Sequence, residues 1–284
     1  ASAGALAGCG AGSELPHKAF VMGVALDEAP DGLIKMTAQV FKPAQTVTGK
    51  GKEGKPFVNI VTQDHSVMEA IRDMTLHLGR KAQWSHMRVI LVSDALARRQ
   101  PLLKLLDMFY RDHEPRLTTH LIVTQGAAGR YLEIAPYIES TISQQYYLSD
   151  QASFESSGKS SRVNLLDLAM QLKSPSAAAA VPYLVASSDG GKPLITGAVA
   201  IAGNGTMKDV MPPALIEGMQ MAKGLYNFGV AEIPCDSGER ARAGGSDIDG
   251  DKDSMEITDH DSRMDVIVRG DELDIRFRTR VQVA

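Results

Sequence analysis

The pattern closest to a metal site is a run of aspartates near residue 250. Its members alternate with other residues and are Asp247, Asp249, Asp251 and Asp253. Alternating carboxylates are typical of calcium-binding loops, but such a loop also needs glycine at its sixth position and glutamate at its twelfth. Counted from Asp247, glycine falls at the fourth position and Thr258 at the twelfth. A solvated acidic loop over residues 236–254 therefore explains the pattern better, and we expect no cofactor.

Ser85 and His86 form the second candidate, since serine and histidine are the nucleophile and base of many hydrolases. Neighbours in sequence do not by themselves make a catalytic pair, because the geometry is set in space, and no Gly-x-Ser-x-Gly elbow occurs. We interpret His86 as a structural residue at the start of an apolar strand. A hydrolase is kept as a hypothesis that requires a nucleophile, a base and an orienting group to converge around Ser85, His86 or His113.

The charged segment from Arg111 to Arg116 reads Arg-Asp-His-Glu-Pro-Arg. Helix capping and solvated ion pairs explain it adequately. We expect an interaction or structural motif, and not a catalytic one, from five residues: Ser85, His86, Arg111, Asp112 and Arg116. The adhesion-like tripeptide Arg269-Gly270-Asp271 is expected at a hairpin tip, where turn chemistry alone favours Gly-Asp.

Cys9 follows eight small or apolar residues, and the run Leu6-Ala7-Gly8-Cys9 resembles a lipobox. In a bacterial lipoprotein leader, small residues precede the cut and the cysteine thiol receives the lipid. We therefore expect lipid attachment at Cys9, with a flexible tether up to residue 17. The alternative is a small-residue tail with an incidental cysteine. The other cysteine, Cys235, adds neither a disulfide framework nor a zinc site.

Composition limits the classes of function. The 284 residues are 44% hydrophobic, which is enough for a sizeable core, and their length favours two or three domains. A net charge of -4 and an aromatic content of 5% argue against a nucleic-acid partner. No run of about 20 apolar residues is present, so no membrane-spanning helix is predicted.

Strands and helices alternate in the first half of the chain. The predicted strands are residues 20–26, 33–41, 57–62, 88–93 and 117–124, and the predicted helices are residues 67–78, 102–109 and 127–134. Ser66 and Glu69 form a capping box before the first helix, and Gly79 ends it. This order predicts an α/β layer with some parallel pairing.

The second half is less regular. Six serines make residues 149–161 a predicted linker or long loop. Further expected elements are helices at 163–172 and 213–226, strands at 183–186 and 195–202, and a tight turn at Asn204-Gly205. Apolar residues alternate with polar ones from Met264 to Val283, which predicts a long antiparallel hairpin with one apolar face.

These patterns predict an α+β, multi-domain protein in which mixed sheets pack with helices. The expected divisions are a lipobox and tether (1–17), an N-terminal α/β domain (18–148), a linker with a small second domain (149–194) and a C-terminal β-rich domain (195–284). We expect the last sheet to be incomplete, because its apolar face needs a cover.

Two blocks of the sequence resemble a known family. They are Leu78-Gly79-Arg80-Lys81 with Ser85 to Val92 and Leu96-Ala97-Arg98, and the run from Phe109 to Leu117. Val24-Ala25-Leu26-Asp27, Gly197-Ala198-Val199-Ala200, Pro234-Cys235 and the strand Phe277 to Val283 follow in the same order. The family is the lipoprotein C subunit of spore nutrient germinant receptors. The chain departs from its pattern after Cys9, where only Glu14 and Leu15 remain of a longer charged segment.

The resemblance implies a three-domain α+β protein, lipid-anchored on the outer face of the spore inner membrane. It would act as a non-catalytic scaffold beside integral membrane A and B receptor subunits and help the receptor respond to nutrients. The family continues beyond the position of Ala284 with helices, which agrees with the uncovered hairpin. A secreted lipoprotein that binds a small molecule is the alternative.

Overall fold

The computed structural model describes residues 18–42, 55–187, 192–226, 229–234 and 252–283. The expected lipid site at Cys9 and its tether lie outside these residues, as do Cys235, Asp247, Asp249 and Asp251. Of Asp253 only the backbone is described.

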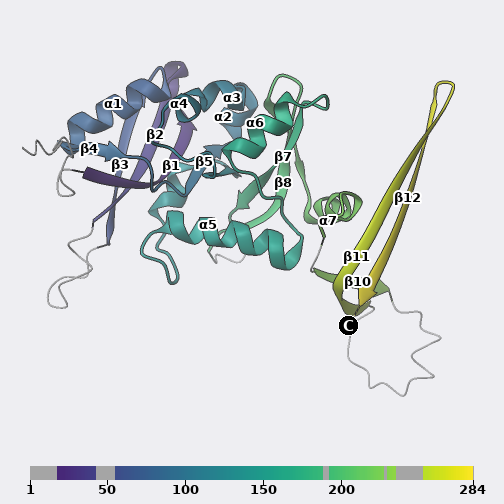
Figure 1. The fold of residues 1–284 in the computed structure, drawn as a ribbon. Helices are drawn as coiled ribbons and strands as arrows, with labels where there is room; N and C mark the ends of the chain where they lie inside the picture. Colours follow the sequence, from purple (N-terminus) through teal and green to yellow (C-terminus); the bar gives the residue numbers. More distant parts are fainter. Residues whose placement is uncertain (1–17, 43–54, 188–191, 227–228, 235–251, 284) are drawn as a thin grey trace, which may run out of the picture.

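A large mixed sheet forms the body of the molecule (Figure 1). Its strands run in the order β3-β2-β1-β5-β6-β7-β8-β9, with β4 paired to the start of β1. The strands are β1 (Lys18–Glu28), β2 (Ile34–Phe41), β3 (Phe57–Asp64), β4 (Lys81–Gln83), β5 (Val89–Ser93), β6 (His120–Thr124), β7 (Ala178–Val185), β8 (Leu194–Ala202) and β9 (Thr206–Met211). β1, β5, β6 and β7 are parallel, and antiparallel strands flank them on both sides. The predicted mixed α+β class is confirmed.

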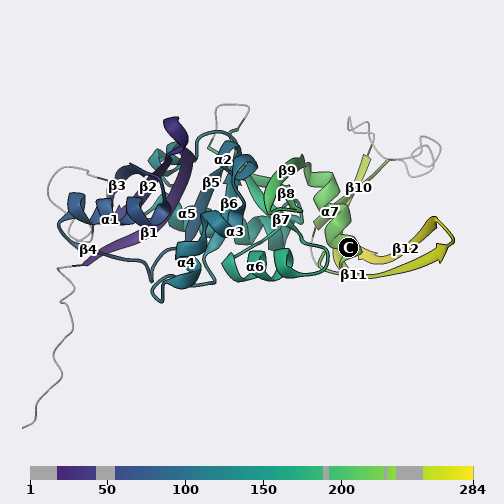
Figure 2. The same cartoon turned by 90° about the horizontal axis from the view of Figure 1, so that it is seen from above.

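Helices cover the two faces of this sheet unequally (Figures 1 and 2). The larger core lies under α1 (Val67–Leu78), α2 (Asp94–Arg99), α3 (Leu102–Leu105), α4 (Asp107–Arg111) and α6 (Leu165–Lys173). The smaller core lies under α5 (Ile142–Ala152) and the 3-10 turn Gly129–Glu133. Strand alternation divides the side chains: Ile90 and Val92 of β5 face the larger core, and Val89 and Leu91 face the smaller one.

Only half of the predicted capping box forms at α1, because the Glu69 carboxylate accepts the Ser66 hydroxyl at 3.1 Å and, within the described structure, not the Ser66 backbone N–H. The Ser66 side chain accepts a hydrogen bond from the Glu69 N–H, and Gly79 ends the helix in the left-handed conformation at φ 60°. The single helix predicted over residues 102–109 is instead two short helices, because the backbone leaves helical geometry at Leu106. The helix predicted over 127–134 is a 3-10 turn.

The serine-rich segment is not a linker. Residues 149–152 complete α5, Ser153–Ser157 form a π-helical turn, and Ser160 is fully buried with its hydroxyl on the Gly197 carbonyl. The expected border between residues 148 and 149 therefore lies inside α5. Beyond this segment, β7, β8 and β9 extend the sheet that β1 begins.

A second, three-stranded sheet contains the predicted hairpin. It consists of β10 (Gly229–Pro234), β11 (Lys252–Arg269) and β12 (Glu272–Val283), all antiparallel. The hairpin turns at Gly270, with φ 62°, and projects away from the large sheet beyond α7 (Pro213–Ala222) (Figure 1). Arg269-Gly270-Asp271 thus lies at the hairpin tip, as predicted.

Candidate functional site

Glu114 joins the two blocks on which the family resemblance rests. One carboxylate oxygen lies 3.0 Å from Lys81 Nζ, and the other accepts hydrogen bonds from Gln83 Nε2 at 3.3 Å and from the Trp84 N–H at 3.4 Å. The hydrogen bond and the charge of Glu114 raise the pKa of the Lys81 ammonium group. The segment after α4 is thereby fastened to β4 and to the residues that lead into β5.

Ser85 and His86 lie at this junction but point to different partners. Ser85 Oγ accepts a hydrogen bond from Gln83 Nε2 at 3.2 Å. The His86 ring packs edge-on against Phe20, with 5.2 Å between ring centroids. Within the described residues, no hydrogen bond joins Ser85 to an imidazole, so the geometry gives a hydrolase at this pair no support.

In the charged segment at the end of α4, Arg111, His113 and Arg116 are solvated, whereas Asp112 and Glu114 are part-buried. Arg111 forms an ion pair with Asp107 one helical turn earlier, at 2.9 Å. Asp112 accepts from the Glu114 N–H at 2.9 Å and lies 3.5 Å from His113 Nδ1, whose side chain is 93% exposed. Arg116 is exposed. The structure therefore links Asp112 to the Ser85 region through Glu114, while Arg111 and Arg116 face solvent.

Asp27 fixes the edge of the smaller core. Its carboxylate, in a residue only 6% exposed, accepts hydrogen bonds from the N–H groups of Ala128 at 2.6 Å and Gly129 at 2.8 Å. A Cβ at position 129 would lie 2.9 Å from Thr37 Oγ1 and 3.2 Å from the Asp27 carboxylate. The Val-Ala-Leu-Asp block thus ends in a carboxylate that holds the loop after β6.

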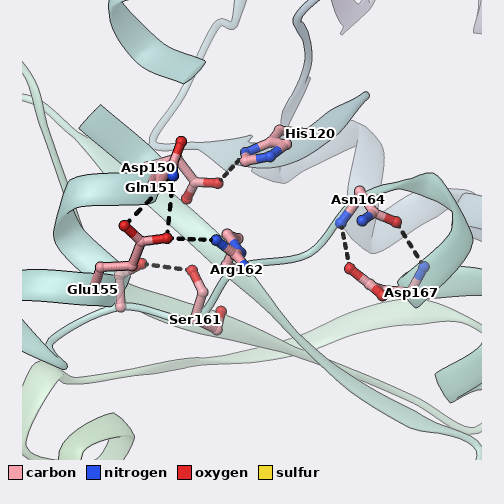
Figure 3. Close-up of polar contacts among 9 residues, drawn as sticks. His120, Asp150, Gln151, Glu155, Ser161, Arg162, Asn164 and Asp167 are labelled. Atoms are coloured by element: carbon pink, nitrogen blue, oxygen red, sulfur yellow. Dashed lines mark hydrogen bonds and ion pairs between the residues drawn. The ribbon is translucent and has the colours of Figure 1, made fainter. Parts of the chain in front are cut away.

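His120 and Asp150 form a buried acid–base pair that the sequence did not reveal (Figure 3). His120 Nδ1 at the start of β6 lies 2.6 Å from Asp150 Oδ2 in α5, and Asp150 is fully buried. The Tyr147 ring packs on His120 at 4.6 Å between centroids, and the Arg88 guanidinium lies 5.5 Å from the Tyr147 ring. The only signals in the sequence are a histidine inside the predicted strand 117–124 and an aspartate inside the predicted linker 149–161.

Burial raises the pKa of Asp150 above its usual value, while the hydrogen bond and charge of His120 and the charge of Arg162 oppose that rise. Arg162 is held 2.9 Å from Glu155, on the π-helical turn. Figure 3 shows the contact between His120 and Asp150 beside the ion pair of Arg162 and Glu155, with the capping box of Asn164 and Asp167 next to them. These contacts fasten the serine-rich segment to the sheet.

The hairpin presents one apolar and one charged face. Paired residues share a face, and the apolar pairs are Met264 with Phe277, Val266 with Ile275, and Val268 with Leu273. Near α7 this face is covered on β11 only: Ile257 is 1% exposed and Tyr226 packs edge-on against His260, while the residues paired with Ile257 and His260 on β12, Val283 and Val281, are 46% and 40% exposed. Toward the tip the six paired apolar side chains are 44% to 69% exposed. The opposite face pairs Asp265 with Arg276 and Asp261 with Arg280.

The described residues contain no group of three or more histidine, cysteine or acidic side chains placed to hold a metal ion. Their helices are all too short or too polar to cross a bilayer.

Comparison with known families identifies the chain. The model for the spore germination protein N-terminal domain matches residues 12–186, which is more than half of the chain. The chain therefore belongs to the spore germination protein family, and the resemblance inferred from the blocks around Ser85 and Glu114 is confirmed.

The chain is also similar to curated proteins of Bacillus subtilis (strain 168). It is 31% identical to spore germination protein B3 over 126 residues, 44% of this chain and 33% of that protein. It is 22% identical to spore germination protein KC over 190 residues, 65% of this chain and 47% of that protein. The matched region thus spans a third to a half of these relatives. The crystal structure of the GerBC protein matches 92% of this chain and 70% of its own, with 17% identity and a TM-score of 0.48.

Proposed function

We propose that the chain is the lipid-anchored C subunit of a nutrient germinant receptor and acts as a non-catalytic scaffold on the outer face of the spore inner membrane. The observation that carries the proposal is the family match over residues 12–186. The integral membrane A and B subunits are the proposed partners, and Cys9 is the proposed site of the lipid.

The contacts of the candidate residues support a structural role. Ser85 accepts a hydrogen bond from Gln83, His86 packs on Phe20, and Asp112 caps the backbone before Glu114. Ser85 and Asp112 are thereby engaged in local contacts at the two ends of the junction, which Glu114 joins through Lys81 and Gln83. The exposed apolar face of the hairpin supports a role in assembly, because exposed apolar patches of soluble domains commonly mark interaction surfaces.

The anchor is tested with the two cysteines of the chain. In spores that produce the protein from its own gene, Cys9→Ala should move it from the membrane fraction to the soluble fraction, because the thiol is the lipid acceptor. Cys235→Ala is the matched control and should leave the protein on the membrane. Continued tight membrane association of Cys9→Ala would count against the anchor.

The partners are tested by co-purification. Affinity-tagged protein extracted from spore membranes in mild detergent should bring down the A and B subunits, identified by mass spectrometry. A strain that lacks the gene should germinate poorly with nutrients, and the wild-type gene should restore germination. Purification without either membrane subunit, together with normal nutrient germination of the deletion strain, contradicts the proposal.

A further inference from the structure

A cavity of about 510 Å³ opens on the α5 side of the sheet, at the end where α5 begins. Phe20 and Met22 of β1 and Phe41 of β2 form its apolar floor. Their neighbours Ala19, Val21 and Val40 belong to the larger core, so strand alternation directs these three side chains to the opposite face. The smaller core does not reach this end of the sheet, and the three floor residues are only part-buried.

Polar side chains from two distant segments form the rim of the cavity. His86 comes from the junction before β5, and Glu139 and Gln144 come from the loop before α5 and from its first turn. Among the described residues, the side chains of Glu139 and Gln144 make no hydrogen bond or ion pair. The Thr141 hydroxyl beside them is already used, because it accepts the Gln144 N–H and caps α5.

Among the described residues that line the cavity, one carries a fixed charge. Glu139 supplies this carboxylate, and neither lysine nor arginine is found in that part of the lining. A ligand of complementary charge therefore bears a cation near Glu139 and an apolar body over the aromatic and thioether floor. The volume lies within the range of about 300–1,000 Å³ that is common for small-molecule sites.

We propose that this cavity binds a small amphiphilic amine, with its ammonium group at Glu139 and its apolar body against Phe20, Met22 and Phe41. His86 and Gln144 supply hydrogen-bonding groups at the rim. The site uses no residue of the hairpin and no lipid anchor, so it goes beyond the proposed scaffold role and can be tested independently of it.

The test is a titration of the full-length protein with three probes that share a phenylethyl body and differ in the charge of the head group, measured by isothermal titration calorimetry and by NMR shifts of the cavity residues. The probes are 2-phenylethylamine, neutral 2-phenylethanol and anionic 3-phenylpropanoate. We expect the amine to bind most tightly and the anion least tightly, with the largest shifts at Phe20, Met22 and Glu139.

Two variants and one control locate the binding. Glu139→Gln should weaken the affinity for the amine by about three- to fivefold and leave the affinity for 2-phenylethanol unchanged, as expected for the loss of a part-exposed ion pair. Ser140→Trp, on the exposed rim, should block both probes without disturbing the strands. Glu133→Gln, an exposed carboxylate outside the cavity, should change neither. Equal affinity for amine and anion, or unchanged binding by Ser140→Trp, overturns the proposal.

Discussion

The Nδ1 atom of His120 lies 2.6 Å from Oδ2 of Asp150, and the two side chains are 9% and 0% exposed. A buried pair of this kind joins β6 to the end of α5 and keeps the following serine-rich turn against the sheet. Removing one member leaves the other buried without its partner, a change that costs several kcal/mol in other proteins. His120→Ala should therefore lower the free energy of unfolding by about 3 kcal/mol at pH 7. Urea titration followed by the fluorescence of Trp84, the single tryptophan, measures it.

The same pair predicts a pH dependence. Because burial raises the pKa of Asp150, the folded state holds the proton more tightly than the unfolded state does. The stability from this group is fully present below the unfolded pKa of about 4 and is lost as the pH rises through the raised folded pKa. Relative to Asp150→Asn, the wild type should thus become less stable as the pH rises above about 4. The exposed carboxylate variant Asp107→Asn serves as control, and a pH-independent difference between wild type and Asp150→Asn contradicts the prediction.

Replacing Asp27 should cause a large loss of stability. Asp27→Ala removes two charge-assisted hydrogen bonds and leaves the buried N–H groups of Ala128 and Gly129 without acceptors. We expect a loss of about 3 kcal/mol in the free energy of unfolding. Glu28→Ala is the matched control: it removes an exposed ion pair with Arg99 and should cost less than about 1 kcal/mol. Equal losses in the two variants would contradict the assigned role.

Alanine variants of two glycines distinguish the cost of backbone strain from the cost of steric overlap. Gly197 has φ +70°, and an added Cβ would lie 2.6 Å from the Met211 carbonyl oxygen. Gly203 has φ +64° with nothing within 4 Å of the added Cβ. Gly203→Ala should cost about 1 kcal/mol, which is the conformational penalty alone. Gly197→Ala should cost about 2 kcal/mol more, because β8 and β9 must also move apart. Thermal unfolding of both variants measures the difference, and similar melting temperatures would contradict it.

The apolar face of the hairpin predicts an assembly phenotype. Val266→Lys combined with Ile275→Glu places a charged pair on that face and should reduce the binding of an apolar dye and the recovery of receptor partners. The unfolding of the large sheet should not change, because these side chains are exposed. The control exchanges the charges of Asp265 and Arg276 on the opposite face and should leave both readouts unchanged. Normal partner recovery by the first variant would argue against this face as an assembly surface.

Most elements of the fold could be predicted because their signals are local. The strands around Val24 and Ile90, the cap at Ser66 and the hairpin beyond Met264 depend on alternation or on a single capping residue. The order of the strands within the sheet could not be predicted in the same way. The placement of β7 beside β6 is decided by contacts between residues about 60 positions apart, such as Val123 with Tyr183.

The serine-rich segment shows why composition misled the prediction. Serines are common in linkers. Ser160 is nevertheless buried, because its hydroxyl donates hydrogen bonds to the carbonyl oxygens of Ser161 and Gly197. Asp150 is buried because His120 approaches from another element. Both partners are distant or conformation-dependent, so no pattern within residues 149–161 reveals them. At the junction near Glu114, the run from Phe109 to Leu117 contains the carboxylate that joins the two blocks, but the predicted motif named Arg111 and Arg116, which face solvent, and not Glu114.

The cross-strand pairing of the hairpin also limits which insertions and deletions its strands can accept. Each step of one residue along β12 turns the side chain to the other face, so that Ile275, Arg276 and Phe277 alternate between the apolar and charged sides. A one-residue insertion within β12 would turn every residue beyond it, and would direct arginines toward the apolar side. In its regular part, from His260 to Val281, the hairpin should therefore change its length in steps of two residues per strand or at the turn around Gly270, whereas the register shift between Ile257 and Asp259 already accommodates a single extra residue.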